Sequence, residues 1–353
     1  MTRIQNKHRG VRAAGAILLS VLSCMLISAA AWAGSTERIG TNAAPELLIS
    51  VGPRSDALGG NTVADVNGAE AIYWNPAGMA SLKGTQVMFT HLSHIGDNDV
   101  NFLGFATKAG DFGTIGFSAK VLSVGDILVT TEAAPDGTGE TLSPTFATVG
   151  VSYARQFTDR VTFGATAQFI NERIQDAQAK GVAFDFGFQY DTGPSGLTFG
   201  FVMKNFGPSL SYSGPAFEIN VPDPNAEPGA DNRTLAFSSA QSELPSYFQL
   251  GAAYKLWNQG ENNFKLLGTF TSNNFTPDDY RVGGELMLKN HLALRGGYNR
   301  FVSDSNLEVY QGPSFGAGIT FPLGGSNMQF DYAQRVVKNF FDDTHEFGLR
   351  VDF

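Results

Sequence analysis

Period-two alternation of apolar and polar residues runs through most of this chain and limits its fold more than any other feature. The pattern is clearest in residues 182–190, where five apolar residues alternate with four small or polar ones (VAFDFGFQY). Ten residues of a strand tilted by about 40° span roughly 25 Å, the height of the apolar band of an outer-membrane barrel. We therefore expect strands that meet lipid on one face and water on the other.

Fourteen segments carry this pattern. They lie at about 85–93, 99–107, 111–131, 145–155, 160–170, 181–190, 196–206, 246–256, 263–272, 280–289, 291–301, 313–322, 327–337 and 345–353. The third is long and is expected to bend near residues 123–125.

The connections between these segments alternate in length. Those after even-numbered strands are short: 108–110, 156–159, 191–195, 257–262, a few residues around Asn290, and 323–326. Those after odd-numbered strands are mostly longer: 132–144, 171–180, 207–245, 302–312 and 338–344. Transmembrane barrels have an even strand number, short periplasmic turns and longer outer loops, whereas a soluble β-sandwich has no reason to alternate. The fold class predicted is therefore all-β, a transmembrane outer-membrane β-barrel of about 14 antiparallel strands.

The first 33 residues are typical of a secretory signal peptide. Four basic residues and no acid precede an apolar stretch at 13–29, and Ala31-Trp32-Ala33 forms a cleavage site. A transmembrane helix and a lipid-attachment site at Cys24 are the alternatives. We predict three parts: a signal peptide at 1–33, an N-terminal hatch or plug at 34–84, and a transmembrane barrel at 85–353.

Charge and cysteine content exclude several functions. Loss of the four basic residues of the signal from the chain's 24 leaves 20 against 33 acidic residues, a net charge of −13. This balance argues against binding to nucleic acid and to anionic lipid headgroups. Cys24 is the sole cysteine, so disulfides, thiolate metal sites and cysteine catalysis are not expected in the mature protein.

Residues 54–82 are the exception to the strand pattern. Gly59-Gly60 allows tight turns, Asp65 or Asn67 can cap a short helix over 69–73, and Pro76 ends it. A barrel of fourteen strands has a wider lumen than an eight-stranded one, which side chains just fill. We therefore expect this segment to plug the lumen, entering from the periplasmic side; a periplasmic tail is the alternative.

The same residues carry a family resemblance. Leu58-Gly59-Gly60 followed by AEAIYWNPAGMA at 69–80 resembles the N-terminal signature of the PorV/PorQ outer-membrane proteins, which are similar to long-chain fatty-acid transporters of the FadL type. The resemblance implies a fourteen-stranded barrel with an internal hatch. It implies a structural hatch motif of Gly59, Gly60, Asn75, Pro76, Ala77 and Gly78, and it transfers no substrate contact and no cofactor.

The resemblance implies two different functions. PorV-like members receive exported proteins in type IX secretion, and FadL-like members move hydrophobic molecules through a lateral opening. We predict a type IX secretion component that binds or shuttles exported proteins, with a passive transporter of hydrophobic solutes as the alternative and an enzyme or purely structural barrel as the third hypothesis. Expected partners are outer-membrane lipid, the barrel assembly machinery, and exported cargo or hydrophobic ligands. The expected location is the outer membrane of a Gram-negative bacterium, which the chain would cross many times.

Other candidate residues give weaker indications. The last strand alternates and ends on an aromatic, so Phe347, Leu349, Val351 and Phe353 resemble a barrel assembly signal. The H-x-x-H-x-x-D-x-D run from His91 to Asp99 offers metal-ligand chemistry, although residues three apart on a strand face opposite ways. We predict no metal site and no enzyme, because no catalytic grouping can be recognised.

Three features are expected to serve the barrel itself. By parity, Asp185, Arg281, Glu285 and Lys289 should point into the lumen and bond to a plug or to water. Gly296-Gly297 should let the wall bend. The 207–245 connection holds six prolines and is either a plain surface loop or one that contacts a partner or folds into the lumen.

Overall fold

The computed structural model describes residues 36–221, 233–237, 239–302, 311–338 and 341–353. The predicted signal peptide lies outside these residues, as does 222–232 in the proline-rich connection. Among the described residues, no helix is long and apolar enough to cross a membrane.

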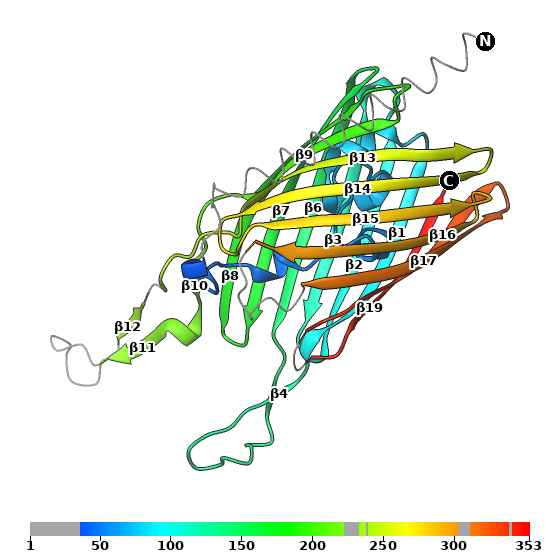
Figure 1. The fold of residues 1–353 in the computed structure, drawn as a ribbon. Helices are drawn as coiled ribbons and strands as arrows, with labels where there is room; N and C mark the ends of the chain where they lie inside the picture. The colour runs from blue at the N-terminus through cyan, green and yellow to red at the C-terminus, as the bar shows by residue number, and fades with distance from the viewer. Residues whose placement is uncertain (1–35, 222–232, 238, 303–310, 339–340) are drawn as a thin grey trace, which may run out of the picture.

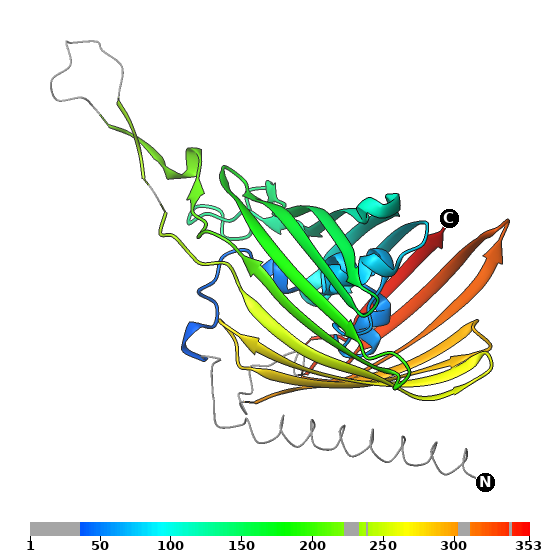
Figure 2. The same cartoon turned by 90° about the horizontal axis from the view of Figure 1, so that it is seen from above.

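Fourteen long antiparallel strands form one closed sheet (Figures 1 and 2). In chain order they are β1 (Thr85–His94), β2 (Asn98–Lys108), β3 (Thr114–Ser123), β6 (Thr145–Thr158), β7 (Val161–Ile174), β8 (Ala177–Asp191), β9 (Leu197–Phe206), β13 (Tyr247–Gln259), β14 (Asn262–Asn273), β15 (Asp279–Leu288), β16 (Leu292–Phe301), β17 (Gly312–Leu323), β18 (Ser326–Arg335) and β19 (Thr344–Asp352). Each pairs with the next along the chain, and β1 pairs with β19, with Gln86 opposite Asp352. The predicted fold class is confirmed.

Side chains alternate between the lumen and the outer surface. In β8, Phe184 and Phe188 are exposed on the outside, whereas Ala183 and Asp185 are buried inside. The last strand follows the same rule, since Phe347 and Leu349 are exposed and Glu346 is buried. This is the arrangement expected of strands that meet lipid on one face and a filled interior on the other.

Short strands gather at one end of the barrel. A hairpin of β4 (Ile127–Leu128) and β5 (Thr141–Leu142) follows β3, and a hairpin of β11 (Glu218–Val221) and β12 (Arg233–Ala236) follows β9. β10 (Tyr212–Ser213) pairs with β8. Both hairpins project beyond the rim, at the end opposite the C-terminus (Figure 1). By the rule of short periplasmic turns we call this end the outer end.

Three expectations about individual strands were wrong. β7 and β8 continue to Ile174 and from Ala177, so the expected long connection at 171–180 is a tight turn. The third strand ends at Ser123, and its expected continuation is the separate hairpin strand β4. Lys289 lies in the exposed turn after β15, not in the lumen.

The N-terminal segment forms short helices that lie at the outer end and inside the lumen (Figure 2). They are η2 (Thr36–Arg38), η3 (Pro45–Leu48), α2 (Pro53–Ala57), η4 (Gly68–Glu70), α3 (Ala71–Trp74) and η5 (Pro76–Ser81). Three further single turns, η6 (Ile95–Asp97), η7 (Gly110–Phe112) and η8 (Pro215–Phe217), lie in connections between strands. We call residues 36–50 the arm and residues 51–82 the hatch.

The arm lies at the outer end of the barrel, so the expectation that this segment enters from the periplasmic side was wrong (Figure 1). The guanidinium of Arg38 donates to Asn274 at 2.9 Å and to Glu243 at 2.8 Å and stacks over the ring of Phe275, all in outer connections. The amide of Ala43 donates to the carbonyl of Glu243. Two outer connections, β9 to β13 and β14 to β15, therefore hold the start of the arm.

Candidate functional site

The hatch packs an apolar cluster against one side of the wall. Hatch residues Val66, Ile72 and Met79 are buried together with wall residues Met88 and Phe102. Because these contacts join α3 and η5 to β1 and β2, hydrophobic burial holds the hatch against the first strands.

Glycines make room for the hatch around the rest of the wall. At ten of them, on ten different strands, an added Cβ would meet the hatch within 3.4 Å: Gly104, Gly116, Gly164, Gly187, Gly200, Gly251, Gly283, Gly297, Gly316 and Gly348. At several of these positions the obstructing atoms belong to the hatch backbone, which cannot turn aside as a side chain can.

Gly297 corrects an expectation. It does not serve only to bend the wall, because a Cβ there would overlap the backbone of Leu58 and Gly59. The neighbouring Gly296 faces the other way, and no hatch atom lies within 4 Å of its Cβ position. Gly297 therefore faces the hatch, and Gly296 faces the lipid.

Three cations and three carboxylates join the hatch to the opposite wall. Arg54 of α2 bonds to Glu285 of β15 at 2.9 Å and to Asp65 of the hatch at 2.6 Å. Lys265 of β14 reaches Asp65 at 3.1 Å and Glu285 at 3.6 Å. Arg295 of β16 bonds to Glu285 at 2.8 Å and to Asp331 at 2.5 Å.

Charge in this network is balanced and mostly buried. Burial opposes ionisation of Asp65, but Lys265 and Arg54 outweigh it and hold the pKa of Asp65 below its usual value. Removing one member would leave its partners charged without compensation in a low dielectric. The expectation that Glu285 bonds to a plug is confirmed, and Arg281 also contacts the hatch by donating to the carbonyl of Gly60 at 3.2 Å.

The predicted hatch motif is spread along the hatch. The side-chain amide of Asn75 donates to the carbonyls of Val63, Phe188 and Phe201 at 2.7, 3.1 and 3.4 Å, and its oxygen accepts from the amide of Ala77 at 3.2 Å. Asn75 thus caps η5 and ties it to the point where β8 meets β9.

The glycines and the proline of the motif mark close approaches. Gly59 and Gly60 have φ of 75° and 73°, a conformation that favours glycine. Pro76 lies against Gly164 of β7, and Gly78 lies against the carbonyl of Val66. We propose that the six motif residues seat the hatch, and no ligand needs to touch them.

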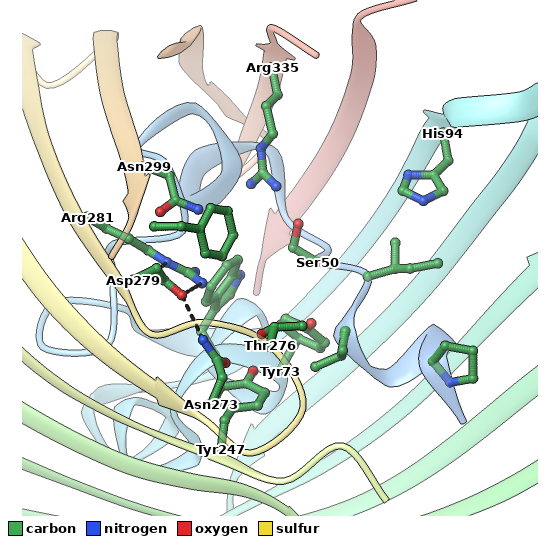
Figure 3. Close-up of a pocket in the computed structure, with 15 residues that line it drawn as sticks. Ser50, Tyr73, His94, Tyr247, Asn273, Thr276, Asp279, Arg281, Asn299 and Arg335 are labelled. Atoms are coloured by element: carbon green, nitrogen blue, oxygen red, sulfur yellow. Dashed lines mark hydrogen bonds and ion pairs between the residues drawn. The ribbon is translucent and has the colours of Figure 1, made fainter. Parts of the chain in front are cut away.

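A cavity of about 300 Å³ remains at the outer mouth, between the arm and the wall (Figure 3). Its floor is Tyr73 and Trp74 of the hatch. Wall residues Tyr247, Asp279, Arg281, Asn299, Phe301 and Arg335 form one side, and Leu48, Ile49 and Ser50 of the arm form another. Some of the lining residues were named from the sequence, Tyr73 and Trp74 within the hatch motif, His94 and Arg281, but they were not brought together, because no spacing connects their segments.

The arm carries a buried carboxyl group that faces a second one. Both side-chain oxygens of Glu46 are enclosed, and its side chain interacts with that of Glu172. Burial, and then the nearby Glu172, raises the pKa of Glu46 to about 8. The backbone around it is held by the ammonium of Lys120, which donates to the carbonyls of Glu46 at 2.8 Å and Ile49 at 3.1 Å.

Docking of the arm is therefore expected to weaken as pH rises from about 4.5 to 8. In that window the released carboxyl ionises while the docked one stays protonated, and each unit of pKa difference corresponds to about 1.4 kcal/mol. Glu46→Gln should remove this dependence and tighten docking above pH 5. A spin label on Thr41→Cys would report arm mobility; equal pH profiles with and without Glu46 would contradict the assignment.

The histidine and aspartate run of β1 and β2 remains a feature of the rim. Nδ1 of His91 lies 3.0 Å from the side-chain oxygen of Asn101, and Nε2 lies 3.7 Å from Asp99. Within the described ranges, no three His, Cys, Asp or Glu side chains gather into a group that could hold a metal. The side chain of His94 instead borders the mouth cavity.

The closed barrel and its fixed hatch define a class, the plugged transmembrane barrels of the outer-membrane type. Solved structures with this fold include the CymD monoaromatic hydrocarbon channel, at 13% identity and a TM-score of 0.56 over 87% of this chain and 98% of that one. The Pseudomonas putida toluene transporter TodX gives 13% and 0.51 over 86% and 97%, and a Pseudomonas aeruginosa FadL homologue gives 13% and 0.51 over 87% and 98%. At such identities the likeness shows the fold alone.

The family of this chain is identified from its sequence. Residues 33–231 match the family described as Type IX secretion system protein PorV, and no curated protein matches the chain. The chain belongs to the PorV family, as its hatch motif indicated. This is a family of type IX secretion proteins and not a family of enzymes.

Proposed function

We propose that this protein binds exported proteins at the outer face of the outer membrane of a Gram-negative bacterium, as the PorV-type component of type IX secretion. The observation that carries this proposal is the seating of the hatch. It touches the wall at glycines on ten strands and is locked by a balanced ion network. A lumen filled in this way leaves no path for a protein chain, so cargo must be met outside the barrel.

Two projecting hairpins supply a surface for such a partner. Ile127 and Leu128 on the first, and Ile219 and Leu235 on the second, are exposed, and both hairpins project beyond the rim (Figure 1). Each hairpin thus exposes a pair of apolar side chains outside the lipid band, and exposed apolar patches mark interaction sites. The net negative charge argues against a nucleic-acid partner.

Replacing these four residues with serine is expected to abolish capture of exported proteins while the barrel still assembles. Pull-down from cells with active type IX secretion would measure capture, and heat-modifiable migration on gels would measure assembly. Glu132→Ala, at an exposed site in the loop of the first hairpin, is the control. Unchanged capture and an unchanged set of secreted proteins would refute the proposal.

A second candidate function is passive transport of hydrophobic small molecules. The mouth cavity favours it, as does the fold shared with CymD and TodX, whose names refer to monoaromatic hydrocarbons and toluene. It predicts an amphiphile bound to the purified protein and uptake of toluene into vesicles. Absence of both would leave the secretion role alone.

A further inference from the structure

The arm lies in the outer mouth as a peptide in a groove, and it is held largely by its main chain. The ammonium of Lys120 donates to the carbonyls of Glu46 at 2.8 Å and of Ile49 at 3.1 Å. The hydroxyl of Tyr73 donates to the carbonyl of Leu47 at 3.2 Å. Any peptide presents such a series of carbonyls, and a hydrocarbon presents none, so these contacts select a peptide chain without reading its side chains.

The groove also recognises one side chain of the arm. Leu47 exposes 2% of its surface, whereas the adjacent Leu48 exposes 39%. The pocket around Leu47 includes Ile170 of β7 and Leu210 and Leu244 of the β9–β13 connection. That connection carries the β11–β12 hairpin, so the groove is continuous with the surface proposed to meet exported proteins.

Two features weaken the arm as an occupant of its own groove. Ala44 has φ of 49° and ψ of 52°, a left-handed conformation that glycine adopts freely and alanine adopts only at a cost. The carboxyl group of Glu46 is enclosed beside that of Glu172, where burial and a like charge both oppose its ionisation. A peptide with glycine and an uncharged side chain at these two places would avoid both penalties.

We propose that the arm is an exchangeable occupant of this groove, and that a peptide segment of an exported protein replaces it, with glycine at the place of Ala44 and leucine at that of Leu47. This inference rests on the proposed function, because the partner is the exported protein itself. Exchange can begin at the outer anchor of the arm, since the paired side chains of Arg38 and Glu243 are 38% and 60% exposed. Because the arm forms one wall of the mouth cavity, exchange would also open that cavity.

Fluorescein-labelled peptides with the sequence of residues 42–50 test the exchange on the mature protein in lipid nanodiscs, with fluorescence anisotropy as the measure of binding. The exchange peptide carries Ala44→Gly and Glu46→Gln and should bind saturably at pH 7.4. The peptide of unchanged sequence should bind at least about tenfold more weakly, because it keeps both penalties. In the protein variant Arg38→Ala the arm loses its outer anchor, and the exchange peptide should bind about threefold to tenfold more tightly than to the parent.

Two further substitutions in the exchange peptide decide the contact. Leu47→Ser leaves the apolar pocket empty and should weaken binding at least about tenfold, whereas Leu48→Ser changes an exposed side chain and should leave binding nearly unchanged. Equal effects of the two substitutions, or no saturable binding of the exchange peptide, would overturn the inference. Because these changes are in the peptide, no variant of the barrel has to fold for the comparison.

The arm of a second copy and a hydrophobic solute are the other candidate occupants, and the same protein distinguishes them. Stable dimers of Arg38→Ala would show that copies of this chain exchange their arms. Displacement of the labelled peptide by toluene would show that the groove takes a hydrophobic solute. Either result would overturn the assignment to an exported peptide.

Failure of this inference is separable from failure of the proposed function. Saturating unlabelled exchange peptide should reduce the pull-down of exported proteins by Arg38→Ala severalfold. Undiminished capture would overturn the inference, because cargo would then be held elsewhere, and the secretion role would stand. If the peptide binds but no exported protein is captured at all, the proposed function fails while the peptide groove stands.

Discussion

Replacing Glu285 with glutamine is expected to destabilise the hatched barrel by about 3–5 kcal/mol, the cost of breaking a buried ion pair by removing one partner. The glutamine has the same shape but leaves Arg54, Arg295 and Lys265 facing one another with less compensation. Arg54 and Arg295 expose only 8% and 1% of their side chains, so solvent screens them little. Urea unfolding, monitored by the loss of heat-modifiable migration on gels, would measure the change in the free energy of unfolding.

Glu261→Gln is the matched control for Glu285→Gln. Glu261 lies in an exposed turn between β13 and β14, and substitutions at such sites usually change stability by less than about 0.5 kcal/mol. Similar effects at the two positions would mean that the ion network does not hold the hatch.

The second large effect is expected at Gly297. A single methyl group in Gly297→Ala would overlap the hatch backbone at Leu58 and Gly59. Neither a strand held by two neighbours nor the closely packed hatch can yield easily, so we expect the hatch to be displaced. Hydrogen exchange of residues 54–82 should rise by more than tenfold.

Gly296→Ala provides the control one residue away. Its methyl group would face lipid, where no hatch atom lies within 4 Å, and hatch exchange should stay unchanged. Equal exchange in the two variants would show that the hatch is not seated on the glycine.

The fold was largely predictable because each strand meets lipid on one side. Alternation of apolar residues gave the strand number, and loop lengths gave the outer end. The prediction failed beyond the lipid-facing part of the strands, where an apolar outer face is no longer required. Residues 171–174 and 177–180 continue β7 and β8 toward the outer end. Their outward side chains are polar there (Asn171, Arg173, Gln178 and Lys180), so the apolar face that marks the other strands is missing.

The hatch seat was predictable only in part. Parity placed Glu285 inside, but it cannot name Arg54 as a partner 231 positions away. Gly297 was recognised within a strand, yet its role depends on what lies opposite, which only the folded chain shows. The arm was placed at the wrong end because its partners, such as Glu243, lie in a connection with no regular pattern.

The hatch is expected to close a lumen that would otherwise be open. Deletion of residues 36–82 tests it better than a shorter deletion, because the arm lies at the outer mouth and the hatch runs from there to β1. Planar-bilayer conductance is the measurement. The intact protein should show no steady current, and the deleted barrel should show stable open channels. A folded, inserted deletion variant that conducts no more than the intact protein would show that the hatch does not close the lumen.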